Sequence, residues 1–296
     1  MRQAVAPKVS VLVPVYKTNV EHLKENIQSV LNQTFKDFEL IIVDDCPSCP
    51  SRATVESFDD PRIKYVVNEA NLGISESRNK LMSLAQGEYY AVLDHDDVCA
   101  YQRFEKEVEF LDNNPRYGAV SSNYMVIPAN EQMYRPEHNS EIKSQLCSMM
   151  PMLHPGMMLR ASVIKKYNIK YREEYSPCED YMLCIELAKY TMLHNLQENL
   201  MFYRDHPGNT SNTQHELMLD RDAACRDYLM LNMPYRYSIS KYYHEKFKED
   251  HLKNFAYREI TYKARFLGLT MMSLKIENNH AYVFLFGCIK VFTIRL

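Results

Sequence analysis

The chain has 296 residues, of which 46% are hydrophobic and 25% are charged, so it suits one large domain or two small ones and is not globally disordered. Glycine occurs only 7 times and nothing repeats, which excludes fibrous and low-complexity proteins. The formal net charge is −3, from 35 Lys and Arg against 38 Asp and Glu, so a dedicated nucleic-acid-binding protein is not expected.

Strand and helix signals alternate over the first 126 residues. Runs of β-branched and aromatic residues predict strands at 8–16, 38–43, 63–67, 89–93 and 118–126. Apolar residues at helical spacing and helix-end signals predict helices at 21–33, 75–85 and 103–113. Strands that alternate with helices are typical of βαβ units, so we expect an α/β fold with a largely parallel sheet.

Two acidic clusters directly follow predicted strands, namely Asp44-Asp45 and the run from Asp94 to Asp97. Ligands of parallel sheets bind outside the carboxyl ends of the strands, so this placement carries more information than acidity alone. Asp94 and Asp96 are spaced D-x-D and could share one divalent cation, Mg²⁺ or Mn²⁺, whose coordination substrate phosphates usually complete. The alternative is a solvated turn in which Asp97 caps the following helix.

The sequence contains neither of the usual glycine-rich phosphate-binding motifs, GxGxxG and GxxxxGK[ST]. A conventional NAD-dependent dehydrogenase or a P-loop enzyme is therefore disfavoured. A site that lacks such a loop but has a D-x-D pair would neutralise a diphosphate through a metal ion instead.

Eight cysteines occur in a chain whose N-terminus lacks the apolar segment and cleavage site of a secretory signal. We therefore interpret them as reduced thiols in a cytoplasmic protein. Cys46 and Cys49 form a lone CxxC, and because a zinc site normally needs a second pair, we favour ordinary loop cysteines over a metal or redox function. The longest apolar runs are shorter than the roughly 20 residues that span a bilayer.

Five short motifs follow one another between residues 11 and 97, and the resemblance that they carry covers roughly residues 8–212. They are Val11–Tyr16 (VLVPVY), Ser29–Thr34 (SVLNQT), Glu39–Asp45 (ELIIVDD), Asn71–Gly73 with Arg78-Asn79, and Leu93–Asp97 (LDHDD). In this order they resemble the family 2 glycosyltransferases. The resemblance implies a Rossmann-like GT-A fold, a nucleoside-diphosphate-sugar donor that is most often a UDP-sugar, a divalent metal, and inversion at the sugar C1. It also implies a role in assembling bacterial surface polysaccharide or lipopolysaccharide.

The resemblance assigns roles to single residues. Pro14, Val15 and Tyr16 would line the base and ribose pocket, Asp44 would bind the base with Asp45 beside it, and Asn71, Gly73, Arg78 and Asp94 would border the nucleotide and its diphosphate. The metal ligands would be Asp96, Asp94 and His206, while His154 and Asp97 would lie near the donor or acceptor sugar. For both histidines the alternative is a purely structural role.

The segment Ser176–Leu183 (SPCEDYML) matches the Glu-Asp motif of the family at the start of a helix. The helix dipole also favours an acidic first turn, and this interpretation is compatible with a catalytic role. An acceptor hydroxyl needs a carboxylate to remove its proton, and the family places that base at the second acid, here Asp180, with Glu179 next to it. Attack would come opposite the departing diphosphate, through an oxocarbenium-like transition state.

Charge and composition divide the chain. Residues 241–296 hold ten Lys and Arg against five Asp and Glu, a balance of +5, and are rich in Tyr and Phe. We expect a catalytic domain over 1–212, with a nucleotide-binding half at about 8–126 and an acceptor half at 127–212, and then a helical, basic and aromatic extension over 213–296. The extension would either dock on the anionic cytoplasmic leaflet, where a lipid-linked acceptor would be found, or pack as a small core or homodimer contact.

These features predict a metal-dependent inverting glycosyltransferase, using Mn²⁺ or Mg²⁺, that moves a hexose or N-acetylhexosamine from a UDP-sugar to a hydroxyl of a glycan or lipid-linked glycan. A non-catalytic scaffold that binds nucleotide sugars is the first alternative. A sugar nucleotidyltransferase is the second, but that class typically has a glycine-rich loop after its first strand, and Pro14–Lys17 contains no glycine.

Overall fold

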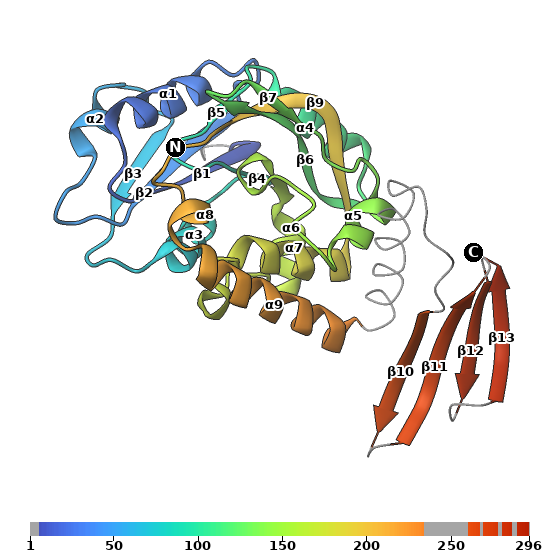
Figure 1. Ribbon diagram of the computed structural model, residues 1–296. Helices are drawn as coiled ribbons and strands as arrows, with labels where there is room; N and C mark the ends of the chain where they lie inside the picture. The colour runs from blue at the N-terminus through green and yellow to red at the C-terminus, as the bar shows by residue number, and fades with distance from the viewer. Residues whose placement is uncertain (1–5, 234–259, 267–268, 278–279, 286–288, 296) are drawn as a thin grey trace. The chain divides into compact units, whose positions relative to one another are not determined.

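The computed structural model describes residues 6–233 together with 260–266, 269–277, 280–285 and 289–295 (Figure 1). The chain divides into two units, Met1–Met233 and Pro234–Leu296.

The first unit is built on one sheet with the strand order β3-β2-β1-β4-β8-β6-β9-β5, in which β7 also pairs with β6. Its strands are β1 Val9–Val15, β2 Phe38–Asp44, β3 Ile63–Val67, β4 Tyr89–Val92, β5 Val98–Cys99, β6 Tyr117–Ile127, β7 Glu131–Met133, β8 Met158–Arg160 and β9 Met192–Arg204. β1 is parallel to β2 and β4, and β2 is parallel to β3, so the expected parallel sheet is confirmed for the nucleotide-binding half. In the other half, β8 runs antiparallel to β4 and β6, whereas β9 is parallel to β6.

The apolar runs of the sequence form the centre of this sheet because parallel strands are covered on both faces. Val11, Val13, Leu40 and Ile42 are fully buried in β1 and β2. The helices α1 and α2 lie on one side of these strands and α3 lies on the other (Figure 1). The sequence therefore specifies the core through continuous strands that alternate with amphipathic helices.

The helices of this unit are α1 Val20–Leu31, α2 Arg52–Glu56, α3 Ile74–Leu84, α4 Arg103–Asn113, α5 Asn139–Gln145, α6 Ala161–Tyr167, α7 Glu179–Tyr190, α8 Thr210–Thr213 and α9 His215–Asn232, with short 3₁₀ turns at His154–Gly156 and Glu173–Tyr175. α1 begins where the Asn19 side chain accepts hydrogen bonds from two backbone N–H groups of the first turn. Its buried apolar face is formed by Leu23, Ile27 and Val30. Within the described ranges, no helix combines the length and apolar character that crossing a bilayer requires.

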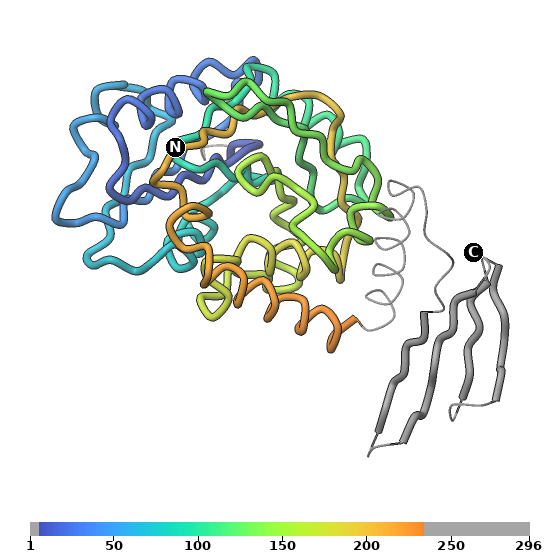
Figure 2. Tube along the Cα trace, in the orientation of Figure 1, coloured from blue at the N-terminus to red at the C-terminus, as the bar shows by residue number. Residues whose placement is uncertain are grey.

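The order of the strands reverses beside β1. The chain adds β2 and β3 on one side of β1, and after α3 it returns to place β4 on the other side (Figure 2). In open α/β sheets, ligands bind at the carboxyl ends of the strands beside such a reversal. The ends of β1, β2 and β4 carry Tyr16, Asp44-Asp45 and the run Asp94–Asp97, so the sheet gathers the predicted nucleotide residues at one edge.

The second unit corrects the expectation of a helical extension. Helix α9 is present, but it is followed by the antiparallel strands β10 Ile260–Phe266, β11 Leu269–Glu277, β12 His280–Leu285 and β13 Ile289–Arg295, each paired with the next. The expectation was wrong for these four strands because it weighed basic and aromatic composition. Stretches such as Lys290–Ile294 alternate or cluster β-branched and aromatic residues, which is a strand pattern.

The boundary between the units also differs from the one expected, because it falls after Met233 and not after residue 212. Helix α9 belongs to the first unit because its Cys225 and Leu229 are buried there. Its Tyr228 hydroxyl also accepts a hydrogen bond from Lys189 Nζ of α7 at 3.0 Å.

Candidate active site

One arginine connects the D-x-D turn with the Glu-Asp motif. Arg78 of α3 is 8% exposed, and its Nη2 donates to Asp94 Oδ1 at 2.8 Å while its Nη1 donates to Glu179 Oε1 at 2.6 Å. Its guanidinium carbon lies 5.5 Å from the centre of the Tyr171 ring. A planar guanidinium binds carboxylates in fixed directions, so Arg78 holds the two acidic motifs beside each other.

The D-x-D turn follows β4 and places an ionised carboxylate against a histidine. Asp96 Oδ2 lies 2.8 Å from His206 Nε2, and Asp96 Oδ1 lies 3.4 Å from His95 Nδ1. Burial raises the pKa of Asp96, but His95 and His206 outweigh burial and hold this pKa well below its usual value. The structure thus brings Asp96 into direct contact with His206, a predicted metal ligand that lies 110 residues further along the chain.

Asp97 lies beneath the turn and is 1% exposed. Its Oδ1 accepts the backbone N–H of Arg204 at 2.8 Å, and its Oδ2 has no partner among the described residues. Burial, together with the charges of the other two aspartates of the turn, raises the pKa of Asp97 well above its usual value. The alternative in which Asp97 caps the next helix is wrong, because α4 begins at Arg103. Contact of Asp97 with a sugar stays a prediction.

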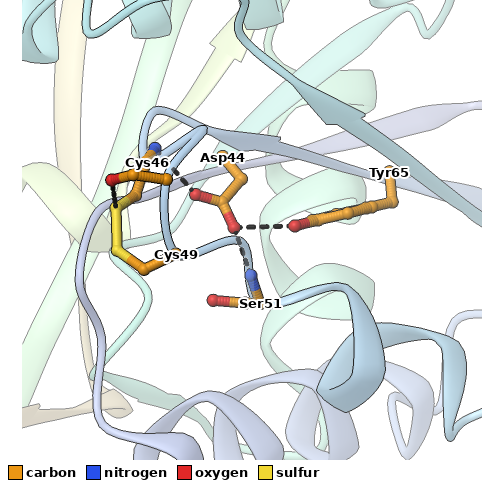
Figure 3. The surroundings of a disulfide bond; sticks show 6 residues. Asp44, Cys46, Cys49, Ser51 and Tyr65 are labelled. Atoms are coloured by element: carbon orange, nitrogen blue, oxygen red, sulfur yellow. Dashed lines mark hydrogen bonds between the residues drawn. A yellow bond between two sulfur atoms is a disulfide. The ribbon is translucent and has the colours of Figure 1, made fainter.

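Asp44 shapes the loop that follows β2. Its carboxylate accepts the backbone N–H groups of Cys46 at 3.0 Å and Ser51 at 2.7 Å, and the Tyr65 hydroxyl at 2.7 Å (Figure 3). Asp44 is fully buried, and these bonds wrap the loop around it. The sequence predicted that Asp44 binds the nucleotide base. In the structure, Asp44 holds the loop after β2 in place at that edge of the sheet.

Asp45 holds the loop that precedes α3. Its carboxylate accepts the backbone N–H groups of Leu72 at 2.8 Å and Gly73 at 2.9 Å, and the Asn68 amide at 2.7 Å. Asn71 Oδ1 also accepts the Gly73 N–H, at 3.2 Å. Gly73 has a φ of +85°, which other residues rarely adopt, so a glycine is needed where the loop turns into the helix. Asp45, Asn71 and Gly73 therefore form one structural group beside Arg78.

The loop after β2 contains a disulfide bond between Cys46 and Cys49 (Figure 3), which corrects the prediction of reduced loop cysteines. The Cys49 N–H donates to the Cys46 carbonyl at 3.1 Å, and this tight turn brings the two Cα atoms to 5.3 Å, within the range that a disulfide spans. The prediction failed because it inferred the redox state from the expected compartment and not from the loop geometry. The remaining buried thiols include Cys99, Cys178, Cys184 and Cys225, and Cys288 lies outside the described residues.

The predicted catalytic pair opens α7. Glu179 is buried against Arg78, whereas Asp180 is half-buried and accepts the backbone N–H of Tyr181 at 2.6 Å through Oδ1. The described residues make no other hydrogen bond to Asp180, so its Oδ2 accepts none from them. Burial and repulsion from Glu179 raise the pKa of Asp180 to about 7. A carboxylate with this pKa is suited to accept a proton near neutral pH.

His154 lies behind Arg78. It is buried, its Nε2 is 2.9 Å from the Tyr171 hydroxyl, and burial together with the charge of Arg78 lowers its pKa well below the usual value, so it is neutral. Asn79 fixes the Tyr171 backbone, donating to its carbonyl at 2.9 Å and accepting its N–H at 3.0 Å. The sequence analysis missed Tyr171, because its contact with Asn79 joins two residues that are 92 positions apart. A contact between His154 and a sugar stays a prediction.

The end of β1 contributes one accessible side chain. Pro14 and Val15 are buried in the sheet, and the Val15 carbonyl accepts the Asp45 N–H at 2.8 Å. Tyr16 is 45% exposed, with Lys17 Nζ 5.0 Å from the centre of its ring. Of the three residues predicted at the base pocket, Tyr16 is therefore the one whose side chain a nucleotide could reach.

Comparison with known proteins agrees with the motifs. A model of the family named glycosyl transferase family 2 matches residues 10–168, more than half of the chain. An uncharacterized glycosyltransferase of Methanocaldococcus jannaschii is 34% identical over 207 residues, which are 67% of this chain and 71% of that protein. The Escherichia coli protein WfgD, named UDP-Glc:alpha-D-GlcNAc-diphosphoundecaprenol beta-1,3-glucosyltransferase, is 36% identical over 124 residues, which are 41% of this chain and 47% of that protein.

The fold also matches a solved structure. S. aureus TarS 1-349 in complex with UDP-GlcNAc has a TM-score of 0.60 and 21% identity to this chain, over 68% of this chain and 60% of that one. This chain thus spans about three fifths of that structure's length, and the likeness shows the α/β fold of GT-A type that the motifs implied. Family match, motif order and fold agree, and the chain belongs to glycosyl transferase family 2.

Proposed function

We propose that this protein is a metal-dependent, inverting glycosyltransferase that moves a hexose or N-acetylhexosamine from a UDP-sugar to a hydroxyl of a glycan or lipid-linked glycan. The observation that carries the proposal is the pair of hydrogen bonds from Arg78 to Asp94 and Glu179. They place a turn suited to a metal and a diphosphate next to a carboxylate suited to accept a proton. Transfer from a donor to an acceptor hydroxyl needs both functions within one site.

The residues of the turn fit a hard divalent cation. Within the part of the chain that the structure describes, no group of three or more His, Cys, Asp and Glu side chains is arranged to hold an ion alone. Mg²⁺ and Mn²⁺ are usually held by one or two carboxylates and completed by substrate phosphates and water. Asp94 and Asp96 with His206 would hold such an ion together with the donor diphosphate. When bound, the ion would neutralise negative charge on the departing diphosphate.

Asp180 would accept the proton of the acceptor hydroxyl. As the acceptor oxygen bonds to the sugar C1, the bond from C1 to the diphosphate oxygen breaks, and the UDP leaves with that electron pair. A single displacement of this kind inverts the configuration at C1. Glu179 cannot take this role as readily, because its Oε1 accepts a hydrogen bond from the Arg78 guanidinium and its buried Oε2 has no partner among the described residues.

The names of similar proteins support the donor and the acceptor class. WfgD is named for a UDP-glucose donor and a diphosphoundecaprenol acceptor, and TarS 1-349 is in complex with UDP-GlcNAc. A panel of UDP-Gal, UDP-Glc, UDP-GalNAc and UDP-GlcNAc, assayed by UDP release and by calorimetric binding, tests the proposal. We expect one donor to bind and turn over. Binding of a donor without any UDP release would instead favour the non-catalytic scaffold, and pyrophosphate-dependent nucleotide exchange would favour the nucleotidyltransferase.

The raised pKa of Asp180 predicts the pH dependence of the reaction. The base must be deprotonated to act, so kcat/KM should rise with pH and level off above about 7. Below that value it should fall by about tenfold for each pH unit, because the protonated carboxyl cannot accept a proton. Initial rates of UDP release between pH 5 and 9 measure this profile. A profile without that acidic limb, or one that Asp180→Asn leaves in place, would assign the base to another group.

The strand register of the second unit bears on membrane contact. The pairing places Tyr262, Leu274, Val283 and Phe292 at one register position across the sheet and Thr261, Lys275, Tyr282 and Thr293 at the adjacent one. We expect the basic region 241–296 to bind the anionic cytoplasmic leaflet, since each Lys or Arg near such a surface contributes about 1 kcal/mol.

Sedimentation with vesicles tests this contact. The full chain should co-sediment with vesicles that contain anionic lipid at low salt, and less at high salt, because ions screen the attraction. Vesicles of neutral lipid are the control. Equal recovery with and without anionic lipid, or unchanged binding after deletion of 241–296, would favour the alternative of a small core or homodimer contact.

A further inference from the structure

Helix α1 presents buried polar groups to the segment that carries the D-x-D turn. Asn26 and Ser29 in the helix and Gln33 just beyond it are spaced by three and four residues, so they follow one face. Asn26 and Gln33 are fully buried, and Ser29 is 9% exposed. The large majority of buried polar side chains make hydrogen bonds, so the targets of these bonds indicate what this face does.

Two of the three hold the backbone after the turn. The Ser29 hydroxyl accepts the Cys99 N–H at 3.1 Å. The Gln33 amide donates to the Ala100 carbonyl at 2.7 Å and accepts the Phe104 N–H at 3.1 Å. These bonds attach β5 and the start of α4 to α1 and do not reach the acidic turn itself.

Asn26 is the member that reaches the turn. Its Nδ2 donates to the carbonyl of Asp94 at 2.8 Å and to the carbonyl of Asp97 at 2.8 Å. The two N–H groups of this amide thus donate to the two ends of the turn. The turn also closes through a hydrogen bond from the Asp97 N–H to the Asp94 carbonyl at 3.2 Å. The buried Oδ1 of Asn26 has no partner among the described residues, so the two donated bonds are what the amide contributes here.

We propose that Asn26 is a positioning residue, which fixes the distance between the Asp94 and Asp96 carboxylates and so sets the affinity of the turn for a divalent ion bound with UDP. The inference rests on the proposed function. Its physical basis is that a turn whose two end carbonyls share one donor group cannot open without breaking at least one of these two bonds. Outer partners that orient metal ligands typically contribute about 10- to 100-fold to metal affinity, and Asn26 occupies such a place.

The test is calorimetric titration of UDP into the full chain, with Mn²⁺ present and with EDTA, for wild type, Asn26→Ala, Asn26→Ser and Ser29→Ala. We expect Asn26→Ala to weaken Mn²⁺-dependent UDP binding by about 10-fold or more. Asn26→Ser retains one donor and should fall between wild type and Asn26→Ala. Ser29→Ala is the matched control on the same helix face, and it should lower the melting temperature while leaving Mn²⁺-dependent binding within about twofold. Binding in EDTA should be equal for all four proteins.

Each other result overturns the proposal. Equal losses of affinity in Asn26→Ala and Ser29→Ala would mean that α1 supports the fold in general. Wild-type affinity in Asn26→Ala would mean that the turn keeps its shape alone. If Asn26→Ala does not fold, wild-type affinity in Asn26→Ser has the same consequence. If the wild type binds UDP equally in Mn²⁺ and in EDTA, the metal dependence is overturned as well. This result is seen in the wild type alone, before any variant is compared.

Discussion

Asp180→Asn is expected to lower the turnover number by about 10²- to 10⁴-fold while donor binding stays near that of the wild type. The amide has the size of the carboxylate and can still accept the Tyr181 N–H through its oxygen, so the start of α7 should be preserved. What it loses is the ability to take the proton from the acceptor hydroxyl. UDP release in the presence of acceptor, with calorimetric binding of the donor, separates the two effects.

The exposed Glu174 of the preceding 3₁₀ turn provides the control. Glu174→Gln removes a carboxylate from the same part of the chain and should leave turnover unchanged. Near-normal turnover in Asp180→Asn would move the base elsewhere, with Glu179 as the next carboxylate to replace.

Asp96→Ala is expected to remove Mn²⁺-dependent UDP binding together with the rate. The carboxylate lies against His206, and its lowered pKa keeps it ionised, so the loss of this proposed direct ligand should exceed the about 100-fold that changes in outer partners can cause. The comparison is made by titrating UDP with Mn²⁺ and with EDTA. Wild type and variant should differ in Mn²⁺ and agree in EDTA.

Asp205→Asn is the control for this variant, because Asp205 is exposed and adjacent to His206 but contacts Asn212 instead of the turn. It should bind UDP with Mn²⁺ like the wild type. If Asp96→Ala keeps the Mn²⁺ effect, the ion is held by other groups and the role of the D-x-D turn is wrong.

The sequence predicted the nucleotide-binding half well because its signals are local. The run Val11–Tyr16 is continuous and apolar, and the acidic residues that follow β2 and β4 mark where these strands end. Parallel packing then brings the strand ends to one edge by a general rule. The order of the motifs indicated the family, which composition alone does not reveal.

The contacts that complete the site were not predictable, because they join distant parts of the chain. Tyr171 stands in no motif, and its place beside Arg78 follows only from the packing of α3 against the segment before α7. Asn26 looks like one polar residue of an amphipathic helix until the fold brings the D-x-D turn against it.

Two of the failed predictions weighed composition or the expected compartment above pattern and geometry. Strands β10 to β13 were predicted to be helical from their basic and aromatic content, although the alternation of their residue types is a strand signal. The Cys46–Cys49 disulfide was missed because the expected compartment favoured thiols. The disulfide depends on the conformation of the turn formed by the two intervening residues, which the sequence did not determine.

The dependence of UDP release on a divalent ion tests the central assignment most directly. With the donor that turns over, release should stop in excess EDTA and return when Mn²⁺ or Mg²⁺ is added beyond the chelator, because the turn of Asp94 and Asp96 would lack the ion that offsets the charge of the leaving diphosphate. Full turnover in excess EDTA would contradict the account.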